Sequence, residues 1–163
     1  MNLSKYTLKD CLLTAIKSEM EAYEIYNKIA KSVKNIMLKD RLEFLAKEEI
    51  KHKEFFEKLY RTTFPDEEIK LPKKSPVPLP EIEFNTEMVL LSDILSAAMD
   101  AEMAAYEFYT ELSKIIKDKS SSNTLKYIAS MEMGHYGLIE IERELARERE
   151  DYEIEWGMMH VGP

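Results

Sequence analysis

The chain has 163 residues, 45% of them apolar, which is enough to bury one core in a single domain. Its 31 acidic and 23 basic residues give a net charge of −8, which disfavours nucleic acid or an anionic membrane as a partner. Cys11 is the one cysteine in the sequence, so an internal disulfide, a zinc ribbon and a rubredoxin-type iron site are excluded. No secretory-type apolar run or bilayer-spanning stretch is found, which predicts a cytoplasmic protein.

Apolar residues at helical spacing predict two helices in the first half of the chain. The first is expected at about residues 7–32 and the second at about 37–60, each with one apolar face. Five prolines between residues 65 and 80 then exclude regular helix, because proline lacks an amide donor and fixes its own φ angle. A linker is therefore predicted at residues 61–85.

Two more helices are predicted after the linker. One is expected at about residues 86–119, with Asn85 or Thr86 as its N-cap, and the other at about 123–151, after a turn in the polar run 120–123. A linker of about 25 residues can span a bundle, since an extended chain covers about 3.3 Å per residue. The predicted fold is therefore an all-α, ferritin-like four-helix bundle, in which a long crossover joins two antiparallel hairpins.

The second half of the sequence repeats the first half at an offset of 83 residues, which supports this division into hairpins. The offset needs no gap and aligns apolar positions throughout both helices of each pair. It also aligns Glu19 with Glu102, Glu49 with Glu132, and His52 with His135. Two similar hairpins related by a pseudo-twofold axis would explain the repeat.

Each half of the repeat combines a glutamate on one apolar helical face with a Glu-x-x-His motif on the face of the partner helix. Residues three apart on a helix point the same way, so the glutamate and histidine of the motif can bind a common centre. Four buried carboxylates without partners would be prohibitive, because each costs several kcal/mol. Two divalent cations would cancel their charge, and carboxylate with imidazole suits iron, manganese or zinc. The predicted ligands are Glu19, Glu49, His52, Glu102, Glu132 and His135.

A single Glu-x-x-His motif can occur by chance, and its two residues would then be expected on the protein surface. Two copies, each preceded by a core-facing glutamate at equal spacing, indicate a metal centre instead, because the apolar stripes run through the same positions. The same ligand set is found in four-helix bundles that hold two iron or two manganese ions.

These motifs resemble the rubrerythrin branch of the ferritin-like superfamily over residues 7–150 or so. The resemblance rests on the two Glu-x-x-His motifs and on Ala15-x-x-x-Glu19-x-x-Ala22-x-x-x-Tyr26 with its copy Ala98-x-x-x-Glu102-x-x-Ala105-x-x-x-Tyr109.

The resemblance implies a role for each site residue. Glu49 and Glu132 would bridge two metal ions. Glu19 and Glu102 would each bind one face of the metal pair, and each histidine would bind one of the two ions. The hydroxyl groups of Tyr26 and Tyr109 would position a carboxylate across the bundle. Typical members carry a further glutamate three residues after the ligand of the third helix, where this chain has Ala105.

The resemblance also implies two iron ions, with manganese or zinc as other possibilities, and a reaction with oxygen or hydrogen peroxide. A peroxidase or ferroxidase in oxidative-stress defence or ferrous iron oxidation is expected. The rubredoxin domain of typical members is absent from these residues, so an external electron donor protein is expected, as is a homo-oligomer, a dimer or larger. A non-enzymatic iron-binding or storage module and a di-manganese catalase or oxygenase remain open.

Gly134 and Gly137 interrupt the fourth predicted helix on either side of His135. Each costs about 1 kcal/mol relative to alanine in an exposed helix interior. Close packing is the favoured explanation, and a small access route is the alternative.

Overall fold

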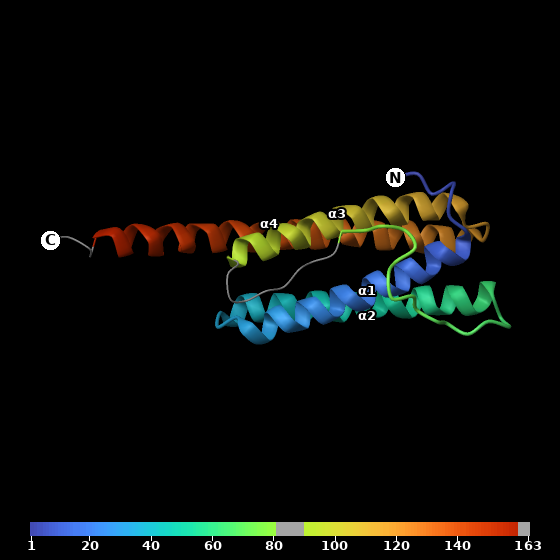
Figure 1. Ribbon diagram of the computed structural model, residues 1–163, viewed down its shortest axis with the longest axis horizontal. Helices are drawn as coiled ribbons and strands as arrows, with labels where there is room; N and C mark the ends of the chain where they lie inside the picture. Colours follow the sequence, from blue (N-terminus) through green and yellow to red (C-terminus); the bar gives the residue numbers. More distant parts are fainter. Residues whose placement is uncertain (81–89, 160–163) are drawn as a thin grey trace.

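The structure is a computed structural model that describes residues 1–80 and 90–159, with side chains described as far as residue 151. Its helices, listed in chain order, are α1 (Leu8–Ser32), α2 (Ile36–Thr63), α3 (Leu91–Ile115) and α4 (Lys119–Met159). Figure 1 shows that α1 is antiparallel to α2 and α3 to α4, whereas α2 and α3 run in the same direction. The predicted all-α, ferritin-like four-helix bundle is confirmed.

The first hairpin begins and turns where short polar side chains bind free backbone N–H groups. The Thr7 side chain accepts from the Asp10 backbone N–H (3.1 Å) and the Asp10 side chain accepts from the Thr7 backbone N–H (3.0 Å), which forms a capping box. Asn35 caps α2 by accepting from the backbone N–H groups of Met37 (3.0 Å) and Leu38 (3.3 Å). The helix α2 continues to Thr63, three residues beyond its predicted end.

The turn between α3 and α4 lies earlier than predicted. The helix α3 ends at Ile115 rather than 119, and the polar run 120–123 belongs to the beginning of α4 instead of forming a turn. The Asp118 side chain accepts from the Ser121 backbone N–H (2.7 Å), so that Asp118 rather than the serines ends the turn. At its other end α4 continues to Met159, past the predicted end at residue 151.

The helix α3 begins at Leu91, five residues after its predicted start, and the expected N-caps Asn85 and Thr86 lie outside the described residues. Leu90 precedes the helix and makes no side-chain cap. Instead, the backbone N–H of Ser92 donates to Glu150 of α4 (3.2 Å), and the Ser92 hydroxyl donates to the same carboxylate (2.6 Å). The start of α3 is therefore stabilised by the neighbouring helix.

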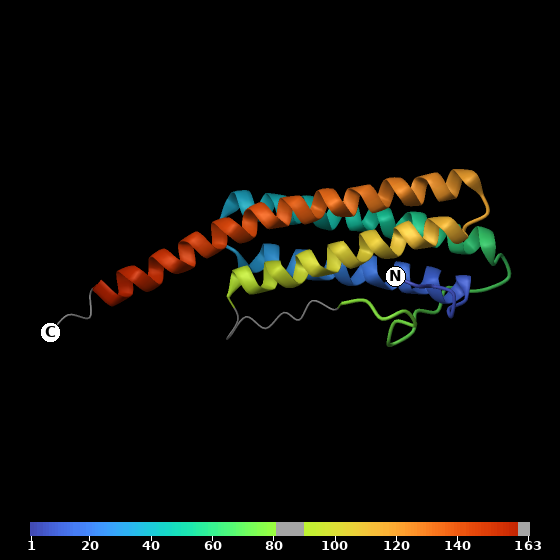
Figure 2. The ribbon, with the colours of Figure 1, turned by 90° about the horizontal axis from the view of Figure 1, so that it is seen from above.

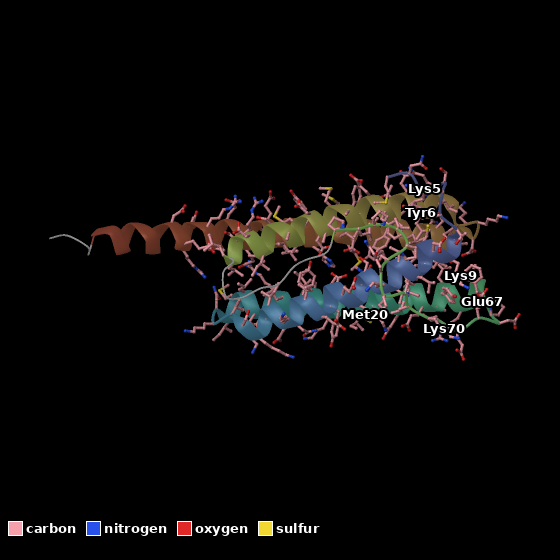
Figure 3. All side chains as sticks on the ribbon, in the orientation of Figure 1. Lys5, Tyr6, Lys9, Met20, Glu67 and Lys70 are labelled. Atoms are coloured by element: carbon pink, nitrogen blue, oxygen red, sulfur yellow. The ribbon has the colours of Figure 1, made fainter. Side chains whose placement is uncertain are left out.

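Two apolar clusters fill the bundle and leave a polar layer between them. One cluster includes Leu12, Ile16, Phe56, Phe108 and Leu125, and the other includes Ile29, Leu42, Leu95, Ala98 and Ile139. Residues 64–80 run beside the bundle (Figure 2), and Val77 among them is buried on the first cluster, with its backbone N–H donating to the Thr14 hydroxyl (3.2 Å). Lys9 of α1 forms an ion pair with Glu67 (Figure 3), which also fixes this segment to α1.

The last part of α4 projects beyond the other three helices (Figures 1 and 2).

The prediction of close packing around Gly134 and Gly137 is wrong for the described chain, because a Cβ atom built at either position would meet no atom within 4 Å. Among the described residues, no helix has a stretch long and apolar enough to cross a membrane.

Candidate metal centre

The polar layer contains all six residues that were predicted as ligands. Each lies on its helix between members of the two apolar clusters, and each is only 1% to 4% exposed. The side chains come from all four helices: Glu19 from α1, Glu49 and His52 from α2, Glu102 from α3, and Glu132 and His135 from α4. The structure thus brings together residues that lie up to 116 positions apart in the sequence.

The first set of candidate ligands surrounds His52. Its Nδ1 atom lies 3.0 Å from Glu132 Oε1, 3.2 Å from Glu49 Oε2 and 3.7 Å from Glu19 Oε2. Each of the four residues offers one ligand atom, and these atoms lie within 4.8 Å of one another. Three carboxylates and one imidazole therefore face a single position.

The second set surrounds His135 in the same way. Its Nδ1 atom lies 3.1 Å from Glu49 Oε1, 3.2 Å from Glu132 Oε2 and 3.8 Å from Glu102 Oε2. Both shared carboxylates direct one oxygen atom toward each histidine, whereas Glu102 belongs to this set alone. The arrangement is that of two positions bridged by Glu49 and Glu132, and the two imidazole rings stack 5.7 Å apart.

Most of the polar atoms in this layer have no hydrogen-bond partner in the protein. Nine buried side-chain nitrogen and oxygen atoms among the described residues are unpaired, and seven of them belong to the candidate ligands. They include both oxygen atoms of Glu49 and both ring nitrogen atoms of His52. Because unpaired buried polar atoms are costly, donor atoms converging on two positions fit a pair of metal ions.

Burial and contacts among the side chains dominate the electrostatics of this layer. Burial raises the pKa of Glu19 and Glu102 well above the ordinary value, and repulsion from the other carboxylates adds to this. Burial disfavours the charged imidazoles, but contacts with the nearest glutamates outweigh it and raise the pKa of His135 to about 12 and that of His52 well above its ordinary value. Burial also opposes ionisation of Glu49, yet both histidines lower its pKa to about 2. Each histidine thus favours the ionised form of the glutamates that it contacts.

Two buried tyrosines flank the layer, one at each apolar cluster. The Tyr26 hydroxyl donates a hydrogen bond to Glu102 across the bundle, as the resemblance implies. The Tyr109 hydroxyl has no hydrogen-bond partner of standard geometry, although it lies near Glu19. Burial raises the pKa of both tyrosines well above the ordinary value, and the adjacent carboxylates add to this, so both hydroxyl groups keep their protons.

The sequence indicated every residue of the two candidate sets, and their role as metal ligands stays a prediction. No further group of three or more candidate ligands is found among the described residues. The sequence did not reveal the contact of Phe56 with the Tyr109 ring (4.8 Å between centroids), because Phe56 could be read only as one residue of an apolar stripe.

Comparisons with known proteins agree with this geometry. One solved structure, described as hypothetical protein Pfu-1136390-001 from Pyrococcus furiosus, is 33% identical to the chain, with a TM-score of 0.82. The match covers 90% of this chain and 94% of that one. None of the curated proteins matches the chain. The profile of the rubrerythrin family matches residues 10–142, which include all six candidate ligands. The chain belongs to the rubrerythrin family.

Proposed function

We propose that this chain is a di-iron carboxylate protein whose centre reacts with oxygen or hydrogen peroxide, in oxidative-stress defence or in ferrous iron oxidation. The observation that supports it most is the pair of shared carboxylates, Glu49 and Glu132, each of which directs one oxygen atom toward each histidine. Glu49 and Glu132 would hold two ions together, and such a pair could act on one small molecule.

The donor set favours iron over softer metals. Each position is faced by three carboxylates and one imidazole nitrogen, which suit iron or manganese, whereas soft metals prefer thiolates. Cys11 is fully buried within an apolar cluster and does not belong to either ligand set.

When bound, two ferrous ions that become ferric supply two electrons, which with two protons reduce hydrogen peroxide to two water molecules. The protein provides the surroundings for this chemistry. The two apolar clusters exclude bulk water on both sides of the layer, and Tyr26 fixes the orientation of Glu102 through its hydrogen bond. Electrons to restore the ferrous state would come from a separate donor protein.

The test begins with metal analysis of protein that is purified without added metal. The ferrous form is then mixed with oxygen or with hydrogen peroxide, and the absorbance is followed by stopped flow. We expect two iron ions per chain. The ferrous form should be oxidised during the stopped-flow measurement, and the protein should turn over repeatedly once a chemical reductant is supplied.

Each alternative outcome has its own signature. Iron that binds stoichiometrically without turnover would replace the proposal with storage or delivery. Manganese in the purified protein, with oxygen evolution from peroxide, would replace it with catalase chemistry. Zinc, which cannot change its oxidation state, would refute the redox function altogether.

A further inference from the structure

One side of the candidate metal centre is packed less closely than the others. The two apolar clusters fill the bundle at both ends of the polar layer, and the helices pack closely within each hairpin. The side of α2 and α4 carries the stacked rings of His52 and His135, and these two helices make the closest contact between the hairpins. The remaining side lies between α1 and α3, so it is the least closely packed approach to the centre among the described residues.

A hollow of about 200 Å³ lies between α1 and α3 at the level of the candidate ligands. Its lining includes Ser18, Ala22, Ile25, Pro80 and Ala101. Ser18 immediately precedes Glu19, and Ala22 lies one turn after the same glutamate. On α3, Ala101 immediately precedes Glu102. The α1/α3 hollow therefore adjoins both of the glutamates that belong to a single ligand set.

Small side chains leave the α1/α3 hollow unfilled. Ala22 of α1 and Ala101 of α3 are both half-buried, and each side chain is a single methyl group. Small residues usually let two helices come close, because the distance between packed helices depends on the side chains at the contact. Here α2 and α4 make the closer contact, so the alanines leave a gap. One water molecule needs about 10–15 Å³ of such space, so the hollow is large enough for hydrogen peroxide with several water molecules.

The α1/α3 hollow breaks the symmetry of the sequence repeat. The 83-residue offset aligns Ile25 with Phe108. Phe108 is fully buried and packs on Tyr109 (5.4 Å between ring centroids), whereas Ile25 is half-buried and borders the hollow. Residues 64–80 run along the side formed by α1 and α3 (Figures 1 and 2), and Val77 is buried on the cluster that contains Phe108. The gap between α1 and α3 is thus filled on one side of the polar layer and hollow on the other.

We propose that the α1/α3 hollow is the route by which the oxidant reaches the centre, and that Ala22 and Ala101 restrict this oxidant to oxygen and hydrogen peroxide. This selection of substrate rests on the proposed redox function. Glu19 and Glu102 are only 3% and 4% exposed, so a molecule that passes between the alanines to reach them has to be small. A tertiary alkyl hydroperoxide carries four carbon atoms and is excluded by its size.

Charge at the hollow favours uncharged molecules. Glu21 and Glu24 also line it; Glu24 is exposed, and Glu21 pairs with Lys17. Oxygen and hydrogen peroxide carry no charge at neutral pH, so these carboxylates do not repel them. Superoxide and other anionic oxidants are repelled, and the net charge of −8 acts in the same direction. The route therefore selects by charge as well as by size.

The first test measures access to the centre without turnover. Nitric oxide is uncharged, resembles oxygen in size and binds ferrous iron, so its binding to the anaerobic ferrous protein is followed by stopped-flow absorbance. Ala22→Phe and Ala101→Phe each fill the hollow from one wall and should slow binding at least about tenfold. Ala104→Phe is the matched control, because Ala104 is also half-buried on α3 but does not line the hollow. Unchanged binding rates in both filled variants, at full iron content, overturn the proposal.

The second test uses the native protein and so does not depend on whether the phenylalanine variants fold. The ferrous form is mixed with hydrogen peroxide or with tert-butyl hydroperoxide, and each rate is divided by that of ferrous iron held by a small chelator. The corrected rate with tert-butyl hydroperoxide should be at least about tenfold lower, and Ala22→Gly should reduce this difference. Equal corrected rates overturn the selection by size. If the ferrous form binds nitric oxide but neither oxygen nor peroxide oxidises it, the proposed function and the substrate selection both fail, whereas the nitric oxide rates still decide the route.

Discussion

Replacing Glu49 with alanine is expected to weaken metal binding at both positions, because this carboxylate belongs to both candidate ligand sets. Its Oε2 atom faces His52 and its Oε1 atom faces His135, so each set falls from four residues to three. The remaining charges are then poorly balanced. After equal loading, we expect the metal content to fall from two ions per chain to one or none.

The effect on thermal unfolding follows from linkage between binding and folding. At a free metal concentration of 100 times the dissociation constant, each filled site stabilises the fold by about 2.7 kcal/mol, so two sites contribute about 5 kcal/mol. A chain of this size gains about 2–4 °C per kcal/mol, so metal should raise the unfolding midpoint by about 10–20 °C. In Glu49→Ala, less than half of this metal-dependent rise should remain.

Glu48→Ala is the matched control, since Glu48 is the adjacent residue and is also buried. Its carboxylate pairs with the exposed Lys51 (2.5 Å) and belongs to neither ligand set. The variant should lose less than about 1 kcal/mol of stability and keep both ions. Glu132→Ala should behave like Glu49→Ala. If both of these variants kept two ions and the full rise of the unfolding midpoint, the bridging assignment would be refuted.

Three further predictions follow from the same geometry. Tyr26→Phe removes the hydrogen bond to Glu102 and should weaken metal binding about 10-fold or more in a competition titration, whereas Tyr60→Phe, at a buried tyrosine whose hydroxyl is unpaired, should leave it unchanged. Metal loading at pH 7 should release protons and acidify a weakly buffered solution, because the pKa of His135 is raised to about 12 in the chain without metal. The affinity for metal should therefore fall as the pH falls. Loading without acidification would contradict this prediction. Ala105→Glu places a carboxylate one turn from Glu102. It should change the absorbance of the ferric form and the rate at which the ferrous form reacts with peroxide. Identical spectra and rates would show that a side chain at position 105 does not reach the centre.

The sequence predicted the buried polar layer well because two independent periodicities coincide at the same residues. Helical spacing placed Glu19 and Glu102 on apolar faces, and the 83-residue repeat aligned them with each other. Either pattern alone would have allowed a surface glutamate. Because both patterns select the same glutamates, they predict that these side chains lie in a buried layer. The structure has both glutamates in such a layer.

Helix ends were predicted less well, because the caps depend on contacts that are remote in sequence or on competition between similar side chains. The start of α3 is stabilised by Glu150, which lies 58 residues after Ser92, and no local pattern reveals such a partner. At the start of α4, Asp118 competes with three following serines as the cap, and all of these residue types are common N-caps. Local propensity could not choose between them.

The division of ligands between the two hairpins has a consequence for synthesis of the protein. Helices pack closely within each hairpin, and between the hairpins α2 approaches α4. Neither hairpin contains a complete ligand set, because His52 needs Glu132 from α4 and His135 needs Glu49 from α2. Since α4 is the last of these four helices to be synthesised, a growing chain has no complete ligand set until α4 has emerged from the ribosome. A chain that still lacks α4 therefore offers three of the four residues of one candidate set and two of the four residues of the other.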